Sequence, residues 1–150
     1  MMRIESSYTS SAPADELWAA LSDPERLGEA LPGVTYVDVE SPERFSATVR
    51  PATTVGITPL DLTVEVRERE EGRRVRLVGD GAGGEHRVTF DVTLSLAPAP
   101  AGCEVTWAAG VQAFGVLASL TQRILPAILR DQVTLVLRTA EEQSASTTTE

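Results

Sequence analysis

The sequence predicts an α+β fold in which a curved antiparallel sheet wraps around a long C-terminal helix, with two short helices after the first strand. Three observations predict it. Residues 12–34 have helical spacing and two proline-containing helix starts. Residues 36–111 then alternate apolar and polar residues in segments separated by turns, which is typical of antiparallel strands with one buried face. Residues 116–143 return to helical spacing.

The N-terminal part begins with a weakly alternating segment over residues 3–11, which we expect to form an exposed strand. Ser11 is a candidate N-cap for the first helix, whose apolar face comprises Leu17, Trp18 and Leu21. Pro24 ends that helix and opens the second one. Pro32 and Gly33 form a turn signal that leads into the sheet.

The sheet is clearest in "LDLTVEVRE", where the apolar residues of 60–66 share one face and the polar residues share the other. The charged stretch around Gly72 predicts a solvated hairpin tip. Residues 88–96 alternate over a full strand, and residues 105–111 form the last one. The glycines of 79–84 fit a strongly bent sheet.

The C-terminal helix has more apolar surface than docking on a flat sheet requires. On a helical wheel, residues 116–141 form two apolar stripes offset by roughly 100°. The first stripe comprises Leu117, Leu120, Ile124, Ile128 and Leu135, and the second comprises Ala118, Leu125, Leu129 and Val136. Pro126 predicts a kink near Leu125. Two interpretations stay open: one stripe lines a cavity beneath the bend, or both stripes pack against protein.

Composition narrows the class of function. The chain has 150 residues, which suits one domain, and its net charge of −9 disfavours nucleic acid and electrostatic docking on anionic lipid. The N-terminus has neither the basic nor the apolar region of a signal peptide, and we expect a cytoplasmic protein.

Catalytic and metal-binding motifs are scarce. Cys103 is the only cysteine and His86 the only histidine of the sequence. A single cysteine excludes an internal disulfide, and we expect neither a metal site nor a cofactor. "GDGAGG" lacks the ending of a phosphate-binding loop and predicts a bend in the sheet. A nucleophile elbow is absent from the sequence, so we name no catalytic residue.

Four stretches carry a family resemblance: "APADELWAALSDPERLGEALPGV" (12–34), "GITPLDLTVEV" (56–66), "GDGAGGEHRVTFDVTLSL" (79–96) and "CEVTWAAGVQAFGVLASLTQRIL" (103–125). Their arrangement resembles the START-like helix-grip superfamily, which includes polyketide cyclases and lipid-transfer domains. The resemblance to the carbon monoxide dehydrogenase G-subunit family is closer. It implies one START-like helix-grip domain over residues 1–143, followed by a disordered tail over residues 144–150.

The resemblance also implies an accessory protein with an apolar pocket, associated with molybdenum hydroxylases and with quinone handling or membrane association. Members often have a C-terminal hydrophobic anchor, whereas this sequence ends in "SASTTTE", so we do not expect membrane association. A homodimer stays open.

The candidate ligand-binding residues are the inward apolar positions of the sheet and the first stripe of the helix. They are Trp18, Leu62, Val64, Phe90, Trp107, Phe114, Leu117, Leu120, Ile124 and Ile128. The alternative for the aromatic residues is an ordinary core. His86, Gln122 and Asp131 are candidate polar contacts. For Gln122 the reason is its backbone carbonyl, which Pro126 leaves without a helical donor. The alternatives are a satisfied rim histidine for His86 and a solvated or paired acid for Asp131.

We therefore expect a non-catalytic carrier for a hydrophobic small molecule, either a lipid or a quinone-like molecule, in an apolar cavity between helix and sheet. It would be accessory to a carbon monoxide dehydrogenase-type molybdenum hydroxylase. One alternative is an assembly module for a redox enzyme that binds no ligand. Another is a cyclase-like enzyme, which the scarcity of inward titratable groups disfavours.

Overall fold

The computed structural model describes residues 2–50, 59–83, 86–114 and 125–148. The chain forms, in order, β1 (Met2–Ser10), α1 (Ala14–Ser22), α2 (Pro24–Ala30), β2 (Val34–Ser41), β3 (Arg44–Val49), β4 (Leu60–Glu70), β5 (Arg74–Gly83), β6 (His86–Ala99), β7 (Gly102–Phe114) and α4 (Leu125–Thr148). This order confirms the predicted α+β fold with two short helices after the first strand and a long C-terminal helix.

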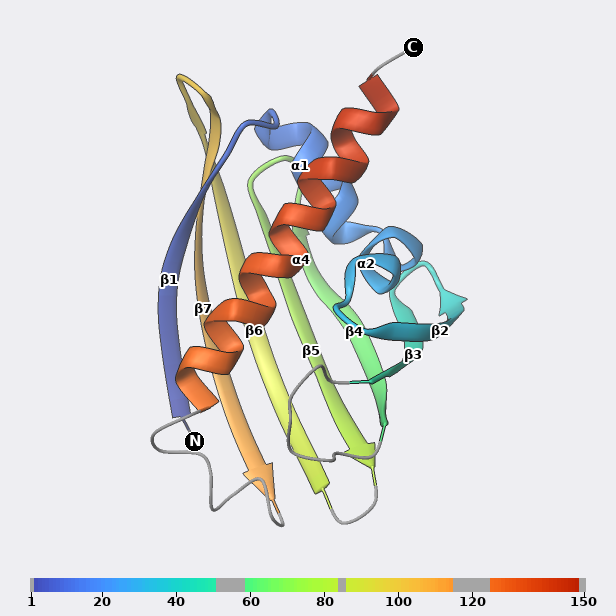
Figure 1. Cartoon of the computed structure of the whole chain (residues 1–150). Helices are drawn as coiled ribbons and strands as arrows, with labels where there is room; N and C mark the ends of the chain where they lie inside the picture. Colours follow the sequence, from blue (N-terminus) through green and yellow to red (C-terminus); the bar gives the residue numbers. More distant parts are fainter. Residues whose placement is uncertain (1, 51–58, 84–85, 115–124, 149–150) are drawn as a thin grey trace.

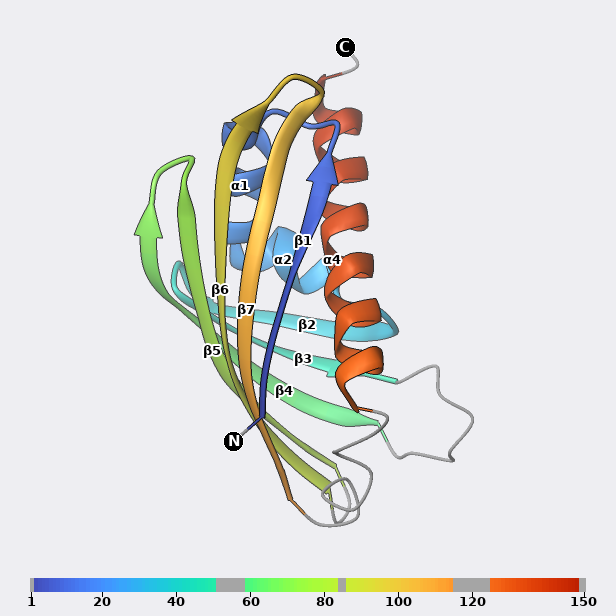
Figure 2. The same ribbon diagram turned by 90° about the vertical axis from the view of Figure 1, so that its left-hand side faces the viewer.

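The strands form one antiparallel sheet of 7 strands in the order β1-β7-β6-β5-β4-β3-β2. The sheet curves around the helices, and α4 lies on its concave side (Figure 1). Figure 2 shows β2 and β3 turning away from the direction of β6 and β7 and reaching across toward α4. The sheet is therefore a grip around the helices, as the sequence predicts.

The two short helices pack on the inner side of the sheet. The Asp23 carboxylate accepts a hydrogen bond from the backbone N–H of Glu25 at 3.2 Å and so caps α2, in which Pro24 is the first residue. Ser11 is not the cap of α1: that helix begins after Pro13, without a side-chain cap. The Ser11 hydroxyl instead donates to the carboxylate of Glu141 on α4.

The charged hairpin between β4 and β5 is exposed, as the sequence predicts, and one of its side chains also ties it to the rest of the fold. A register shift between Val66 and Glu68 places Arg69 opposite the buried Val75. The Arg69 guanidinium then donates to the backbone carbonyls of Ser22, at 3.0 Å, and Pro42. This side chain ties the hairpin to the end of α1 and to the β2–β3 turn.

The described part of α4 runs from Leu125, and Pro126 is its second residue. The predicted helical residues 116–124 lie outside the described residues, and with them the turn in which a kink would appear. At its other end α4 continues to Thr148 and enters the segment 144–150, for which composition predicts disorder. Extending an existing helix avoids the cost of nucleating a new one.

The core-facing side of α4 is the second of the two predicted stripes. Leu137 and Ala140 are fully buried, and Leu129, Val133 and Val136 pack partly buried against the core. Leu135, from the first stripe, is 39% exposed. Over its described length α4 therefore buries one ordinary stripe, and the first stripe does not face the sheet at Leu135.

Candidate functional site

The inner face of the sheet has two parts that differ in how well they are covered. The first, which we call the closed end, comprises the inward residues of 75–77 on β5, 94–96 on β6 and 103–107 on β7. All of these are buried: Val75, Leu77, Leu94, Leu96, Cys103, Val105 and Trp107. Helices α1 and α4 cover this part (Figure 1), so it is a filled core.

The second part, which we call the open end, comprises the inward residues of 60–62 on β4, 79–83 on β5 and 88–92 on β6. Cross-strand pairing aligns Leu62, Gly81 and Val88 in one row and Gly79 and Phe90 in the next. The apolar side chains here stay partly exposed although strand alternation directs them inward: Leu60, Leu62, Val88, Phe90 and Val92.

Three glycines on the inward side of β5 shape the open end. An ideal Cβ at Gly79 would lie 2.3 Å from the carbonyl oxygen of Thr63, and one at Gly83 would lie 2.4 Å from that of Pro59. Both contacts are far shorter than real Cβ contacts, so β4 approaches β5 too closely for a side chain there. The glycines therefore permit the bend of the sheet and leave β5 without side chains at this end.

The N-terminal half of α4 crosses in front of β7 and β6 at the open end (Figure 1). Leu129 and Val133 project from this half of the helix toward the core and are partly buried. From the other side, β3 contributes the buried side chains of Phe45, Ala47 and Val49. The described walls of the open end are thus hydrocarbon on three sides.

The predicted sheet residues divide between the two ends. Leu62 and Phe90 lie at the open end and are partly exposed, and Val64 lies beside them, 3% exposed. Trp107 is 2% exposed in the closed end, which makes it core. Trp18 also belongs there, because its indole N–H donates to the carbonyl of Arg74 at 2.8 Å.

Phe114 lies on the other face of the sheet. It pairs with Arg87 and is 42% exposed. On the same strand Val111 points inward, and Phe114 lies an odd number of residues after it. Because successive strand residues point to opposite faces, Phe114 points away from α4. It is therefore not part of the predicted cavity wall.

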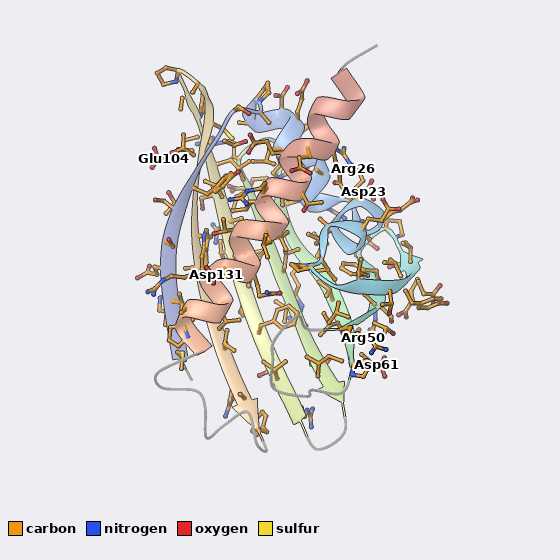
Figure 3. All side chains as sticks on the ribbon, in the orientation of Figure 1. Asp23, Arg26, Arg50, Asp61, Glu104 and Asp131 are labelled. Atoms are coloured by element: carbon orange, nitrogen blue, oxygen red, sulfur yellow. The ribbon has the colours of Figure 1, made fainter. Side chains whose placement is uncertain are left out.

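The predicted helix and rim residues are only partly placed. Leu117, Leu120, Gln122 and Ile124 lie outside the described residues. Ile128 lies in α4 and His86 starts β6, but their side chains are outside the described part. Asp131 is exposed on the N-terminal half of α4 (Figure 3), where water solvates it.

Val88 and Val92 line the open end with Leu62 and Phe90 but are not among the predicted site residues. Neither are Leu129 and Val133 of α4, which pack partly buried against the core. The alternation of β6 already predicts that its two valines point inward, because both lie an even number of residues from Phe90. For Leu129 and Val133 the choice depends on which stripe of α4 faces the sheet, and a helical wheel gives only relative angles.

The outer face of the sheet is polar. Two hollows of about 430 Å³ and 460 Å³ lie there, and both include Asp91 and Gly110 in their walls. Between them Arg76 donates to both carboxylate oxygens of Asp91, at 3.0 and 2.6 Å. The hydrogen bonds and charge of Arg76 hold the pKa of Asp91 below its ordinary value. Neither hollow lies between α4 and the sheet.

A polar cluster anchors α4 at the closed end. The Glu141 carboxylate accepts from the Tyr8 hydroxyl at 2.6 Å, from the Ser11 hydroxyl, and from the Ser11 backbone N–H at 3.3 Å. Burial works to raise the pKa of Glu141, but the hydrogen bonds from Ser11 and Tyr8 outweigh it and lower that pKa. Burial and the Glu141 carboxylate raise the pKa of Tyr8 to about 12.

Cys103 lies close to this cluster in a fully buried position. Burial, with the nearby Glu141 carboxylate, raises the pKa of its thiol. A thiol with a raised pKa is a poor nucleophile and metal ligand, so Cys103 serves as core.

Neither a metal-binding cluster nor a membrane-spanning helix occurs among the described residues. Among them, no group of three or more His, Cys, Asp or Glu side chains comes together to hold a metal ion. In the same part of the chain, helices are too short or too polar to cross a bilayer.

Comparison with known proteins gives a family and several structural neighbours. The model of a family described as "Polyketide cyclase / dehydrase and lipid transport" matches residues 1–141. No curated protein matches the sequence significantly. A conserved protein of Geobacillus kaustophilus superposes with a TM-score of 0.87 at 18% identity, with 97% of this chain and 96% of that chain covered.

Two other solved structures are similar over nearly their whole length. The protein TTHA0849 of Thermus thermophilus has a TM-score of 0.75 at 16% identity, with 99% of this chain and 100% of that chain covered. A Rhodobacter sphaeroides protein has a TM-score of 0.65 at 21% identity, with 96% and 92% covered. At these identities the likeness establishes the fold alone.

Proposed function

Because the chain belongs to the polyketide cyclase / dehydrase and lipid transport family, we propose that it is a non-catalytic carrier for a hydrophobic small molecule. The guest lies between the N-terminal half of α4 and the open end of the sheet, within one domain that spans residues 1–143.

The observation that carries this proposal is the incomplete cover of inward apolar side chains. Leu62, Val88 and Phe90 project toward α4 and yet remain partly exposed. Covering apolar surface contributes about 25 cal/mol per Å², so a guest that shields these side chains and its own surface gains affinity from both.

The chemistry of the walls supports binding over catalysis. The described inward side chains of the open end are those of leucine, valine and phenylalanine, which offer contact and no proton transfer. The titratable cluster around Glu141 and Tyr8 lies at the closed end, where it fixes α4 to β1. A cyclase-like activity would need an acid or base beside the guest.

Native mass spectrometry of protein purified without detergent tests the proposal, together with solvent extraction of the same sample. We expect a discrete mass adduct that extraction removes, and saturable binding of a neutral fluorophore such as N-phenyl-1-naphthylamine to the extracted protein. A protein that has no adduct and binds no neutral apolar probe would refute the carrier function.

The finer identity of the guest and partner rests on the sequence resemblance to the carbon monoxide dehydrogenase G-subunit family. We propose a lipid or quinone-like guest and a cytoplasmic role accessory to a molybdenum hydroxylase of that type. Co-purification of such an enzyme with the tagged protein, reversed by competition with untagged protein, would support the role. Its repeated absence where both are expressed would count against it.

A second candidate function is an assembly module that binds no ligand, alone or as a homodimer. The exposed apolar side chains of Tyr36 (61%), Val39 (45%) and Leu135 (39%) favour it, because they lie on β2 and on the outer side of α4, away from the core. Light scattering across a concentration series distinguishes the two. Self-association that Leu135→Ser abolishes would support the module, and a monomer at all concentrations would exclude the homodimer.

A further inference from the structure

We propose that Gly81 sets the cross-section of the guest that the carrier accepts, an inference that rests on the proposed function. The residue lies on β5 at the centre of the open end. It pairs with Leu62 of β4 on one side and with Val88 of β6 on the other.

Gly81 differs from the other two inward glycines in what a side chain would meet. At Gly79 the obstacle is the carbonyl oxygen of Thr63 on β4, 2.3 Å from an ideal Cβ. At Gly83 it is the carbonyl oxygen of Pro59, just before β4, at 2.4 Å. At Gly81 the closest obstacle is the Cδ2 methyl of Leu62, at 2.5 Å, followed by the Cγ1 methyl of Val88 at 3.2 Å, and the nearest backbone atom is the Asp61 carbonyl oxygen at an ordinary 3.8 Å.

An alanine is therefore permitted at position 81 if Leu62 moves and the Val88 methyl shifts slightly. The backbone of Gly81 is not in the left-handed region, so a side chain brings no backbone strain there. Leu62 is partly exposed, and its terminal methyls belong to a rotatable side chain with several staggered conformations. Moving one residue's methyl costs far less than parting two paired strands.

The direction of that movement links Gly81 to binding. The Leu62 methyl now lies over the bare backbone of β5, in the space that a side chain at position 81 would occupy. A methyl at position 81 displaces it away from the sheet, toward the N-terminal half of α4. In the proposed carrier this is the volume of the guest, so the pair Gly81 and Leu62 determines how thick a guest fits.

The substrate class that follows is apolar and broader than a single acyl chain, such as a fused or substituted ring. A slender chain fits beside a displaced Leu62, whereas a ring system in contact with the floor does not. One added methyl group in a fitted apolar pocket changes affinity by roughly tenfold or more.

The test measures two neutral fluorescent probes, pyrene as the broad one and a linear tetraene fatty alcohol as the slender one. We expect Gly81→Ala to weaken pyrene binding by roughly tenfold and to change binding of the alcohol by less than about twofold. Leu62→Ala added to Gly81→Ala restores pyrene binding, because it removes the displaced methyl. Val78→Ala, on the outward side of the same strand, is the matched control and leaves both affinities unchanged.

The possible outcomes distinguish a failure of the role of Gly81 from a failure of the carrier function. If the extracted wild-type protein binds neither probe, the carrier function fails. If it binds both and Gly81→Ala binds pyrene equally well, only the role of Gly81 fails. A Gly81→Ala protein that does not fold also overturns the inference, because Leu62 was then not free to move. Leu62→Ala alone is the reference for the double variant, and Gly81→Ala should weaken pyrene binding less in that background than in the wild type.

Discussion

The closed and open ends of the inner face belong to the same strands and follow the same alternation, yet only one of them is a filled core. In the closed end β5 contributes Val75 and Leu77, which are buried beneath α1 and α4. In the open end the same strand contributes Gly79 and Gly81, and the neighbouring Leu62 and Val88 stay partly exposed. Strand alternation thus determines the direction of a side chain, and the opposing helices determine whether it is covered.

The largest difference between the two ends should appear in the free energy of unfolding. Leu137 is fully buried where α4 crosses the closed end, whereas Leu129 is partly buried near the open end. We expect Leu137→Ala to cost about 3 kcal/mol, from lost burial and the cavity left behind, and Leu129→Ala about 1 kcal/mol. Urea denaturation of the two variants measures both values.

Equal losses for the two leucines would mean that both ends of α4 are packed alike, and the distinction between the ends would fail. The two variants share the helix and the type of substitution, so each is the control for the other.

Gly79 and Gly81 of β5 provide the next test, which compares a side chain that meets backbone atoms with one that meets side-chain atoms. Gly79→Ala places a methyl group against the carbonyl of Thr63, and we expect it to destabilise the fold by about 2 kcal/mol. Gly81→Ala should cost clearly less, because it meets only side-chain atoms at close range. Thermal unfolding of the pair gives the order, and a reversed order would show that the sheet relaxes differently from what these contacts require.

Two phenylalanines on opposite faces of the sheet test which face binds an apolar molecule. Phe90 lines the open end and Phe114 lies on the outer face. We expect Phe90→Ala to weaken binding of a neutral apolar probe by about tenfold, whereas Phe114→Ala leaves binding unchanged and alters stability by at most about 0.5 kcal/mol. Loss of binding in Phe114→Ala would place the guest outside the open end.

The smallest effect should be the pH dependence of the anchor at the closed end. The hydrogen bonds from Ser11 and Tyr8 lower the pKa of Glu141 in the folded protein. A carboxyl whose pKa is lowered by folding contributes stability above its unfolded pKa, and that stability is lost as the pH falls through the folded pKa. We therefore expect the wild type to lose more stability than Glu141→Gln when the pH is lowered into the acid range.

Chemical denaturation at several acidic pH values measures this difference. Glu142→Gln, at the exposed neighbouring position of the same helix, is the control and should follow the wild type. A Glu141→Gln protein with an unchanged pH profile would show that the anchor contributes nothing to the charge dependence of folding.

Local patterns predicted the fold because each element carries its own signal. The alternation of β4 identified its inward residues, and Asp23 with Pro24 marked the start of α2. The long C-terminal helix and the sheet that it packs against follow from the change in period along the chain. These features depend on neighbours in sequence, which is the information that a single sequence contains.

The site was predicted less well because it depends on contacts between distant residues. Trp107 and Phe90 share inward parity on adjacent strands, and only the position of α1 and α4 decides that the first is core and the second is partly exposed. The bond between Tyr8 and Glu141 joins residues 133 positions apart and has no local signal. The error at Phe114 was avoidable, since the parity of β7 already directs it outward.

The opposite placement of the two chain ends has a practical consequence. β1 starts at Met2, opposite Val111 in the row of Gly79 and Phe90, whereas α4 ends beyond Glu141, which is anchored at the other end of the sheet. A biosensor surface that captures the protein through a C-terminal tag would therefore leave the open end facing the flowing solution, while an N-terminal tether would crowd it.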